Sequence, residues 1–274
     1  MQRQRQGAAP SPSPGSAGST PRPAEDTPIP KRGAVVGGKI FQRAIAVAGR
    51  IRDHRFHGIY RRFREFTMIP QDVYIANLKL AGAAAAIPGA IVECGTWKGG
   101  MIAGMAMILG RRRDYYLFDS FEGLPPAQPI DGPAARRWQQ DTRSPHYFDN
   151  CTAAASDAAA AMALAGIPDA RIVKGWFEET LPAASFPQGI ALLRLDADWY
   201  ASTYQVLSSL FRFVNENGLI IVDDYYCWDG CARAVHDFLS RQKRPERISS
   251  YRGVCFIRKR KAEEDAPEVA DPLP

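Results

Sequence analysis

The chain has 274 residues, of which 46% are hydrophobic and 23% are charged, a composition typical of globular proteins that excludes a wholly disordered chain. The formal net charge of +6 raises nucleic acid as a candidate partner. No apolar stretch approaches the roughly 18 residues of a membrane span, and the N-terminus lacks the apolar segment of a signal peptide. We therefore expect a cytoplasmic protein without a membrane partner. The five cysteines include no C-x-x-C pair, which argues against a disulfide framework or a structural zinc site.

Both ends of the chain have the composition of disordered tails. Residues 1–33 are rich in proline, serine, glycine and alanine, and residues 262–274 carry five acidic residues and no basic one. Residues 34–85 are expected to form an N-terminal helical arm or lid, because apolar residues recur at helical spacing from Ile40 to Phe63 with arginines on the opposite face. Most of the positive charge lies in the first tail and the arm, so we expect no nucleic-acid partner for the main domain, residues 86–261.

From residue 89 onward, short apolar runs alternate with helical patterns, which is typical of a parallel α/β sheet. Ligands bind such sheets beyond the carboxyl ends of the strands. Residues 121–150 show little periodicity, and we expect them to form a lid over an acceptor, since long loops in compact domains are often functional. Strands are predicted over residues 89–95, 114–119, 170–174, 190–196 and 218–223, helices over 100–109, 153–165, 202–214 and 231–241, and a closing antiparallel hairpin over 248–258.

A glycine-rich turn follows the first predicted strand. The run Glu93-Cys-Gly-Thr-Trp-Lys-Gly-Gly100 lacks the ending of a P-loop and departs from the G-x-G-x-x-G pattern of dinucleotide-binding folds. Asp119 ends the next predicted strand, where a carboxylate can accept hydrogen bonds from both hydroxyls of a ribose. This pair of features indicates either a nucleoside site or a tight turn followed by a helix cap.

Acidic residues end two later strands. Leu195-Asp-Ala-Asp198 ends one and Ile221-Val-Asp-Asp224 ends the other, with one crossover helix between them. If these strands are neighbours, Asp196, Asp223 and Asp224 converge, and carboxylates that lie so close repel one another unless a cation or protons lie among them. Ligands that are all oxygen favour a hard ion such as Mg²⁺. The alternative is that one or two of these acids cap the following helices.

These segments together resemble the macrocin O-methyltransferase family of S-adenosylmethionine-dependent enzymes, which includes sugar methyltransferases of macrolide and aminocoumarin type. The resemblance spans about residues 67–240 and implies a class I methyltransferase (Rossmann-like) fold with a seven-stranded sheet. The matching runs, in the order of the family, are Thr67-Met68, Glu93 to Gly100, Asp119-Ser-Phe-Glu-Gly-Leu-Pro125, Gly175-Trp-Phe-Glu-Glu-Thr-Leu-Pro182, Leu193-Arg-Leu-Asp-Ala-Asp198, Tyr200-Ala-Ser-Thr203, Asp223-Asp-Tyr225 and Cys231-Ala-Arg-Ala-Val235.

The resemblance also implies roles for individual residues. The glycine-rich turn would hold the methionine part of S-adenosylmethionine, and Asp119 would bind its ribose. Asp198 would be the general base, and Mg²⁺ would be held by Asp196, Asp223 and Asp224. Ala197 stands where glycine is usual. The residues implied to bind the cofactor are Thr67, Met68, Glu93, Gly95, Thr96, Trp97, Gly99, Asp119, Ser120, Gly175, Trp176 and Asp196.

The expected function is O-methylation of a hydroxyl, of a sugar in a natural product such as an antibiotic, with the metal holding two vicinal hydroxyls of a small-molecule acceptor. Three alternatives remain open. One is a catechol-type O-methyltransferase with an aromatic acceptor, for which an aromatic-lined slot would be evidence. The others are a non-enzymatic nucleic-acid-binding protein that uses the arginine-rich arm and a hydrolase that uses Asp196 and Asp198. A homodimer also remains open, because the arm could cover a neighbouring subunit.

Overall fold

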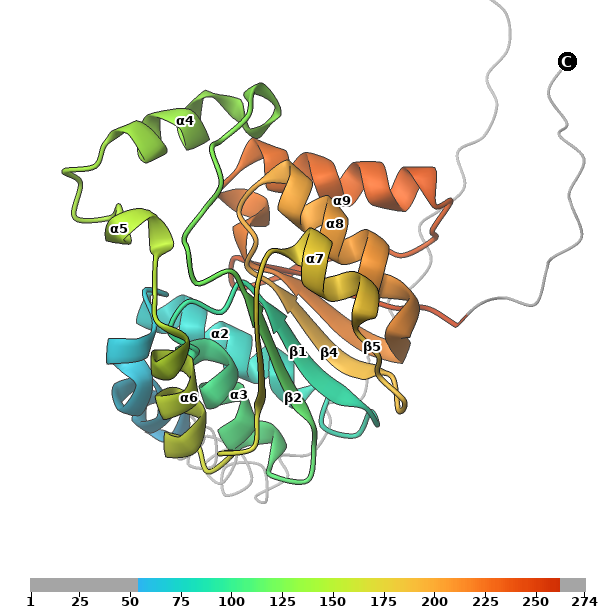
Figure 1. Ribbon diagram of the computed structural model, residues 1–274. Coiled ribbons are helices and arrows are strands. Elements are labelled where there is room, and N and C mark those ends of the chain that lie inside the picture. Colours follow the sequence, from blue (N-terminus) through green and yellow to red (C-terminus); the bar gives the residue numbers. More distant parts are fainter. Residues whose placement is uncertain (1–53, 262–274) are drawn as a thin grey trace, which may run out of the picture. The chain divides into compact units, whose positions relative to one another are not determined.

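A seven-stranded sheet forms the centre of the computed structural model, which describes residues 54–261 (Figure 1). The first five strands in the sequence run parallel, and β7 is antiparallel to both β5 and β6. This arrangement confirms the predicted sheet with its closing hairpin. In spatial order the strands are β3 (Arg171–Lys174), β2 (Tyr115–Asp119), β1 (Ala90–Cys94), β4 (Ile190–Leu195), β5 (Val214–Val222), β7 (Val254–Arg258) and β6 (Ile248–Tyr251).

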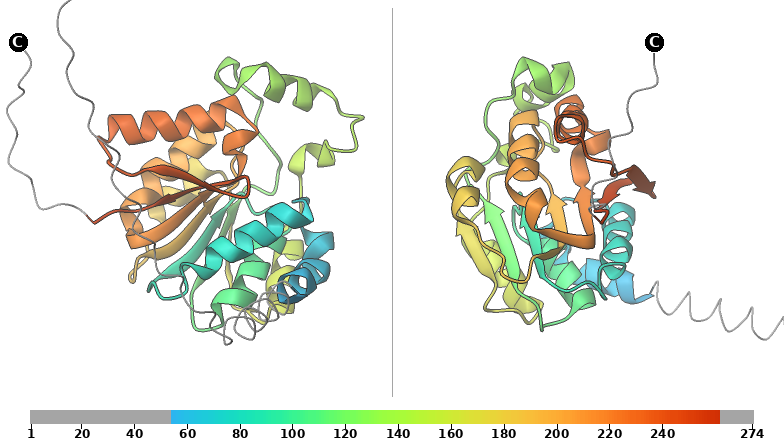
Figure 2. Two further views of the ribbon diagram at one scale, coloured as in Figure 1. Left: turned by 180° about the vertical axis from the view of Figure 1, so that it is seen from behind. Right: turned by 90° about the vertical axis from the view of Figure 1, so that its right-hand side faces the viewer.

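Helices cover both faces of the sheet (Figure 2). One group consists of α2 (Gln71–Gly82), α3 (Gly100–Leu109) and α6 (Ala155–Leu164), and the other of α7 (Phe177–Thr180), α8 (Tyr200–Leu210) and α9 (Asp229–Arg241). Successive side chains of a strand point to opposite faces, so Ile91 belongs to the core beneath the first group and Val92 to the core beneath the second. All residues of β1 and β4 are buried, as expected for parallel strands that are covered on both sides.

Two local features differ from the sequence expectation. The helix predicted to reach Val214 ends at Leu210, and Val214 already pairs with Ile190 as the first residue of β5. Apolar periodicity does not show this end, because Phe211 and Val214 remain buried beyond it. Within residues 121–150 the chain forms α4 (Gly132–Gln140), a mostly polar helix with proline in its first turn. The short elements are η1 (Arg64–Phe66), η2 (Pro129–Asp131), α5 (Phe148–Cys151), η3 (Leu181–Ala183), η4 (Phe211–Phe213) and η5 (Asp223–Tyr226).

Part of the expected N-terminal arm lies inside the described range. Residues 54–63 are helical, and Phe56, Ile59 and Phe63 are buried in the core beneath α2 and α3. The rest of the arm, residues 34–53, and the two tails, residues 1–33 and 262–274, lie outside the described residues. Over residues 54–261, no helix is long and apolar enough to cross a membrane.

Candidate active site

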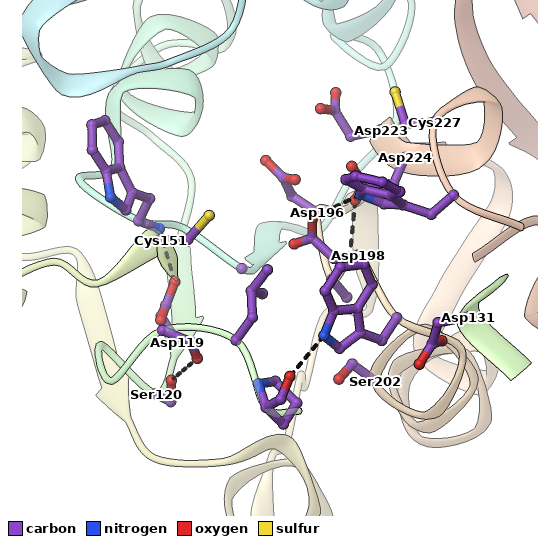
Figure 3. Close-up of a pocket in the computed structure, with 18 of the residues that line it drawn as sticks. Asp119, Ser120, Asp131, Cys151, Asp196, Asp198, Ser202, Asp223, Asp224 and Cys227 are labelled. Carbon is purple, nitrogen blue, oxygen red and sulfur yellow. Dashed lines mark hydrogen bonds between the residues drawn. The ribbon is translucent and has the colours of Figure 1, made fainter. Parts of the chain in front are cut away.

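A pocket of about 900 Å³ lies at the carboxyl ends of the parallel strands (Figure 3). Its walls include Asp119 at the end of β2, Asp196 just after β4, and Asp223 just after β5. Residues 123–151 contribute a further part of the wall. Pockets for a small ligand span about 300–1,000 Å³, so this pocket lies near the upper end of that range.

The glycine-rich turn between β1 and α3 lines one end of the pocket. Gly95 has a φ of 82°, and a Cβ atom there would collide with the backbone carbonyl oxygen of Asp196. Only glycine therefore fits at this position. Gly99 is buried and precedes α3 with a φ of 76°, and the hydroxyl of Thr96 donates to the carbonyl of Phe118 at 3.3 Å. The turn is thus tied to the ends of β2 and β4.

Asp119 fixes this turn through its carboxylate. One oxygen accepts the backbone N–H groups of Thr96 at 2.6 Å and Trp97 at 2.8 Å, and the other accepts that of Phe121 at 2.7 Å. Burial raises the pKa of Asp119 above its ordinary value, although the three hydrogen bonds act in the opposite direction. A carboxylate offers about four acceptor positions, so about one remains for a ligand. Asp119 therefore has a structural role besides the ribose contact implied by the resemblance.

The other residues expected to bind the cofactor fall into two groups. Met68, Gly95, Trp97, Ser120, Gly175 and Trp176 line the pocket with Asp119 and Asp196. The remaining four lie behind its wall: Glu93 and Thr96 are buried, Gly99 caps α3, and the hydroxyl of Thr67 accepts the backbone N–H of Ile69 at 3.2 Å. The expected residues thus lie in one region of the structure, but not all of them line the pocket.

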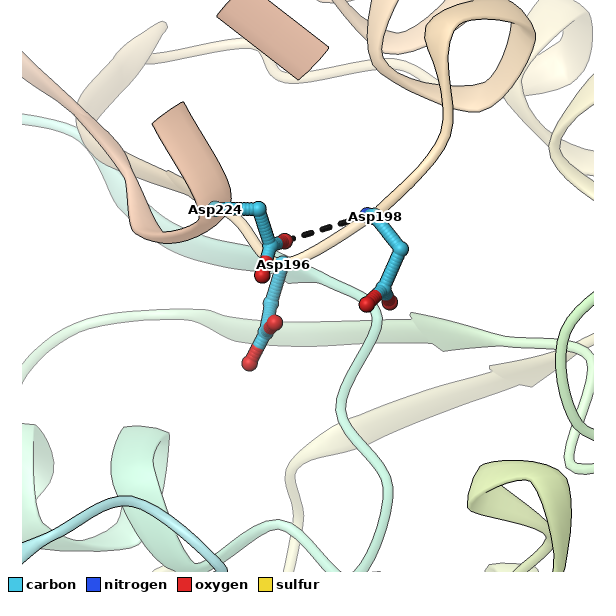
Figure 4. Close-up of side chains that lie close together, drawn as sticks. All are labelled: Asp196, Asp198 and Asp224. Atoms are coloured by element: carbon cyan, nitrogen blue, oxygen red, sulfur yellow. Dashed lines mark hydrogen bonds between the residues drawn. The ribbon is translucent and has the colours of Figure 1, made fainter. Parts of the chain in front are cut away.

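Three carboxylates meet in the middle of the pocket (Figure 4). Asp196, Asp198 and Asp224 each offer an oxygen within 4.8 Å of the others. The backbone N–H of Asp198 donates to Asp224 at 3.1 Å, and the indole N–H of Trp228 donates to Asp198 at 3.0 Å. Asp198 has a φ of 54°, a left-handed conformation that aspartate tolerates better than most residues and that is concentrated at functional sites.

Asp223 is not a member of this group, and a buried arginine contacts both Asp223 and Asp196. The guanidinium of Arg194 lies 2.5 Å from an oxygen of Asp223, 2.8 Å from Asp196 and 2.9 Å from Glu93. The side chain of Arg194 is 1% exposed, and it also donates to the side chain of Asn77 in α2 at 3.4 Å. Arg194 therefore connects β1, the end of β4 and the end of β5. The sequence runs included Arg194, but nothing in its local pattern indicates this role.

Asp198, Asp223 and Asp224 have a raised pKa and hold protons more tightly than ordinary carboxyl groups. Burial, and then the charge of Asp196, raises the pKa of Asp198 to about 8. Burial raises the pKa of Asp223 to about 6 against the opposing effect of Arg194, and burial together with Asp198 raises the pKa of Asp224. These shifts express the cost of several buried negative charges close together. A cation among them would remove that cost.

The donor set fits a hard divalent cation, since it consists of carboxylate oxygens without histidine or thiolate. Asp196 and Asp224 belong both to the observed group and to the metal ligands implied by the resemblance. The third member differs: the observed group contains Asp198, whereas the implied set contains Asp223, which contacts Arg194.

The pocket also contains side chains that the sequence analysis did not single out as site residues. Trp138, Trp199 and Trp228 come from α4, from the turn after β4 and from the segment before α9, and all three line the pocket. Their only sequence signal was the lack of periodicity around Trp138 and the position of Trp199 next to an acidic strand end.

Comparisons with known proteins identify relatives of this chain. The family model described as macrocin O-methyltransferase (TylF) matches residues 53–259. The 8-demethyl-8-(2,3-dimethoxy-alpha-L-rhamnosyl)-tetracenomycin-C 4'-O-methyltransferase of Streptomyces olivaceus is 33% identical over 175 residues, or 61% of this chain and 64% of that protein. The mycinamicin III 3''-O-methyltransferase of Micromonospora griseorubida is 30% identical over 164 residues, or 57% of this chain and 62% of that protein. The matches thus span less than two thirds of the length of these relatives.

A solved structure extends the likeness to the fold. The O-methyltransferase NovP has a TM-score of 0.61 and 25% sequence identity to this chain, and the match covers 72% of this chain and 83% of that one. This likeness and the strand order confirm the expected class I methyltransferase fold. Because the family model covers most of the chain, including nearly all described residues, the chain belongs to the macrocin O-methyltransferase (TylF) family.

Proposed function

We propose that the protein is an S-adenosylmethionine- and Mg²⁺-dependent O-methyltransferase that methylates a hydroxyl of a sugar in a natural product. The observation that carries the proposal is the group formed by Asp196, Asp198 and Asp224 in the pocket that also contains Asp119 and the glycine-rich turn. Relatives named as methyltransferases of glycosylated natural products support the sugar acceptor. The cofactor would lie along the turn, and the acceptor would lie on the other side of the acids.

The residues of the chain would divide the work between binding and proton transfer. Asp196, Asp223 and Asp224 would hold the metal and, through it, two vicinal hydroxyls of the acceptor. S-adenosylmethionine supplies an electrophilic methyl group when bound, and a divalent ion lowers the pKa of a hydroxyl that it binds. Asp198 would accept the proton of the reacting hydroxyl. The pKa of about 8 belongs to the cluster without a cation; a cation held beside Asp198 would lower this pKa and favour the carboxylate that accepts the proton.

The third metal ligand can be identified with two matched variants, Asp198→Asn and Asp223→Asn. Binding of Mn²⁺, followed by electron paramagnetic resonance, is measured together with methyl transfer to glycosides that bear adjacent hydroxyls. A general base at Asp198 predicts a rate loss of about 10²–10⁴-fold with metal binding retained in Asp198→Asn. Loss of metal binding in that variant would instead make Asp198 a ligand. The exposed Asp169 provides the control variant Asp169→Asn, and full activity in EDTA would contradict the metal role.

The catechol-type alternative is favoured by one observation, the aromatic side chains in the pocket. Trp138, Trp199 and Trp228 line the pocket, and Trp228 donates to Asp198, as expected if a planar acceptor lay there. Parallel screens of catechols and of glycosides with vicinal hydroxyls separate the two functions. Methylation of catechols but of no glycoside would replace the sugar proposal.

A further inference from the structure

Three tryptophans form a corner in the wall of the pocket on the side of the acids away from the glycine-rich turn. Trp199 follows β4 directly after Asp198, Trp228 precedes α9, and Trp138 lies in α4. We name these three residues the tryptophan corner. Trp199 is 2% exposed, whereas Trp138 and Trp228 are half-buried. The corner joins three segments that are distant in the sequence.

The three indole rings stand nearly perpendicular to one another. The ring centroids of Trp199 and Trp228 are 5.3 Å apart with an interplanar angle of 66°. Those of Trp138 lie 6.0 Å from Trp228 at 63° and 6.2 Å from Trp199 at 73°. All three are edge-to-face contacts, one of the preferred arrangements of aromatic pairs. A flat ring laid parallel to Trp138 or Trp228, the two half-buried members, would therefore be inclined to the other by about the same 63° that separates these two indoles.

Every indole N–H of the corner already has an acceptor. Trp138 donates to the carbonyl of His146 at 3.0 Å, Trp199 to the carbonyl of Pro125 at 2.9 Å, and Trp228 to Asp198 at 3.0 Å. These bonds fix the orientation of the rings and leave no indole donor for a ligand. The corner therefore offers a ligand the faces and edges of its two half-buried rings, and these rings are held in place before the ligand binds.

We propose that the tryptophan corner is a subsite for a planar aromatic ring of the acceptor, placed next to the hydroxyl that is methylated. An aromatic ring can stack on one of the two half-buried indoles and stand edge-to-face to the other, whereas a sugar ring can offer an indole only its C–H groups and has no π system of its own. The contact between Trp228 and Asp198 places the subsite beside the proposed base. The inference rests on the proposed function and adds to it that the acceptor carries an aromatic group.

The five tryptophans of the chain make the test direct. Trp97 and Trp176 line the pocket near the turn, and the corner contains the other three. Protein labelled with ¹⁵N gives one indole N–H signal for each tryptophan, assigned by single Trp→Phe variants. S-adenosylhomocysteine with Mg²⁺ is added first, followed by 4-nitrophenyl α-L-rhamnopyranoside or methyl α-L-rhamnopyranoside. These two glycosides have the same vicinal hydroxyls and differ in the aromatic group.

The expected result is that S-adenosylhomocysteine shifts the signals of Trp97 and Trp176. The nitrophenyl glycoside then shifts those of Trp138 and Trp228 and binds more tightly than the methyl glycoside. Each lost aromatic contact is expected to weaken binding about 2- to 10-fold. Trp138→Ala should therefore raise the dissociation constant of the nitrophenyl glycoside by about that factor, Trp138→Phe should raise it less, and neither should change that of the methyl glycoside.

The control variant is Arg137→Ala, because Arg137 is an exposed neighbour in α4 that is absent from the pocket wall. Equal affinity for both glycosides, or corner signals that neither glycoside shifts while S-adenosylhomocysteine binds, would overturn the inference and leave the proposed function standing. No response of any tryptophan to S-adenosylhomocysteine would overturn the proposed function itself. The spectra of the unaltered protein decide between these outcomes even if a Trp138 variant does not fold.

Discussion

Replacing Arg194 with methionine should destabilise the protein strongly at pH 8 and less at pH 5. The guanidinium is 1% exposed and lies within 2.9 Å of oxygens of Glu93, Asp196 and Asp223. Removing one partner of a buried ion pair typically costs about 3–5 kcal/mol, because the remaining charge loses its compensation. Domains of this kind are stable by only about 5–15 kcal/mol, so the loss would be a large fraction of the total.

The pH dependence of this loss of stability follows from the raised pKa values of Glu93 and Asp223. Burial, despite the opposing effect of Arg194, raises this pKa from its ordinary value of 4.5 to about 8. Because the folded-state pKa lies above the unfolded value, the contribution of Glu93 to the free energy of unfolding is fully present below pH 4.5 and is lost as the pH rises through about 8. Without Arg194 this pKa rises further, which by itself changes little up to pH 8. The pKa of Asp223, about 6 beside the guanidinium, rises as well, so the free energy of unfolding of the variant should keep falling between pH 6 and pH 8. At pH 5 the carboxyl of Glu93 carries a proton, and the loss shrinks to about 1–3 kcal/mol for unpaired polar groups.

Urea unfolding of both proteins in EDTA at pH 5 and pH 8 measures this difference. Arg247→Met is the matched control, since Arg247 is exposed. The double variant Arg194→Met/Glu93→Gln should recover part of the stability at pH 8, because it removes the carboxylate left without a partner. A loss below about 1 kcal/mol at pH 8, or the same loss at both pH values, would refute the view that Arg194 stabilises the fold by compensating these charges.

Three further predictions concern the cofactor turn and the metal. Asp119→Ala removes the acceptor of three backbone N–H groups. It should lower the free energy of unfolding by about 2–4 kcal/mol and weaken S-adenosylhomocysteine binding measured by calorimetry. The same effect in the control Asp114→Ala, at an exposed residue, would contradict this prediction. Gly95→Ala should abolish that binding through collision with the chain at Asp196. Gly110→Ala, with φ 87° and no atom near its Cβ, should lower the free energy of unfolding by about 1–3 kcal/mol and leave cofactor binding intact. Mg²⁺ binding at pH 7 should release protons from the cluster, since the pKa of Asp198 is about 8; calorimetric heats that do not vary with the ionisation enthalpy of the buffer would contradict this.

The order of strands and helices could be predicted because it depends on local patterns. The short apolar runs of β1, β2, β4 and β5 are buried on both faces, and such runs are visible in the sequence without knowledge of their neighbours. The ends of the helices could not be predicted in this way. Phe211 and Val214 are buried in different elements, so hydrophobicity alone could not show where α8 ends.

The sequence by itself determined that acids and a glycine-rich turn would lie at one edge of the sheet, because parallel strands bring their carboxyl ends to the same side. Only the tertiary structure showed which acids lie closest together. Asp198, with its left-handed backbone, has an oxygen within 4.8 Å of oxygens of Asp196 and Asp224, while Asp223 contacts Arg194. The tertiary structure also brings together three tryptophans from α4, from the turn after β4 and from the segment before α9. Such contacts depend on packing between distant segments, and no local periodicity encodes them.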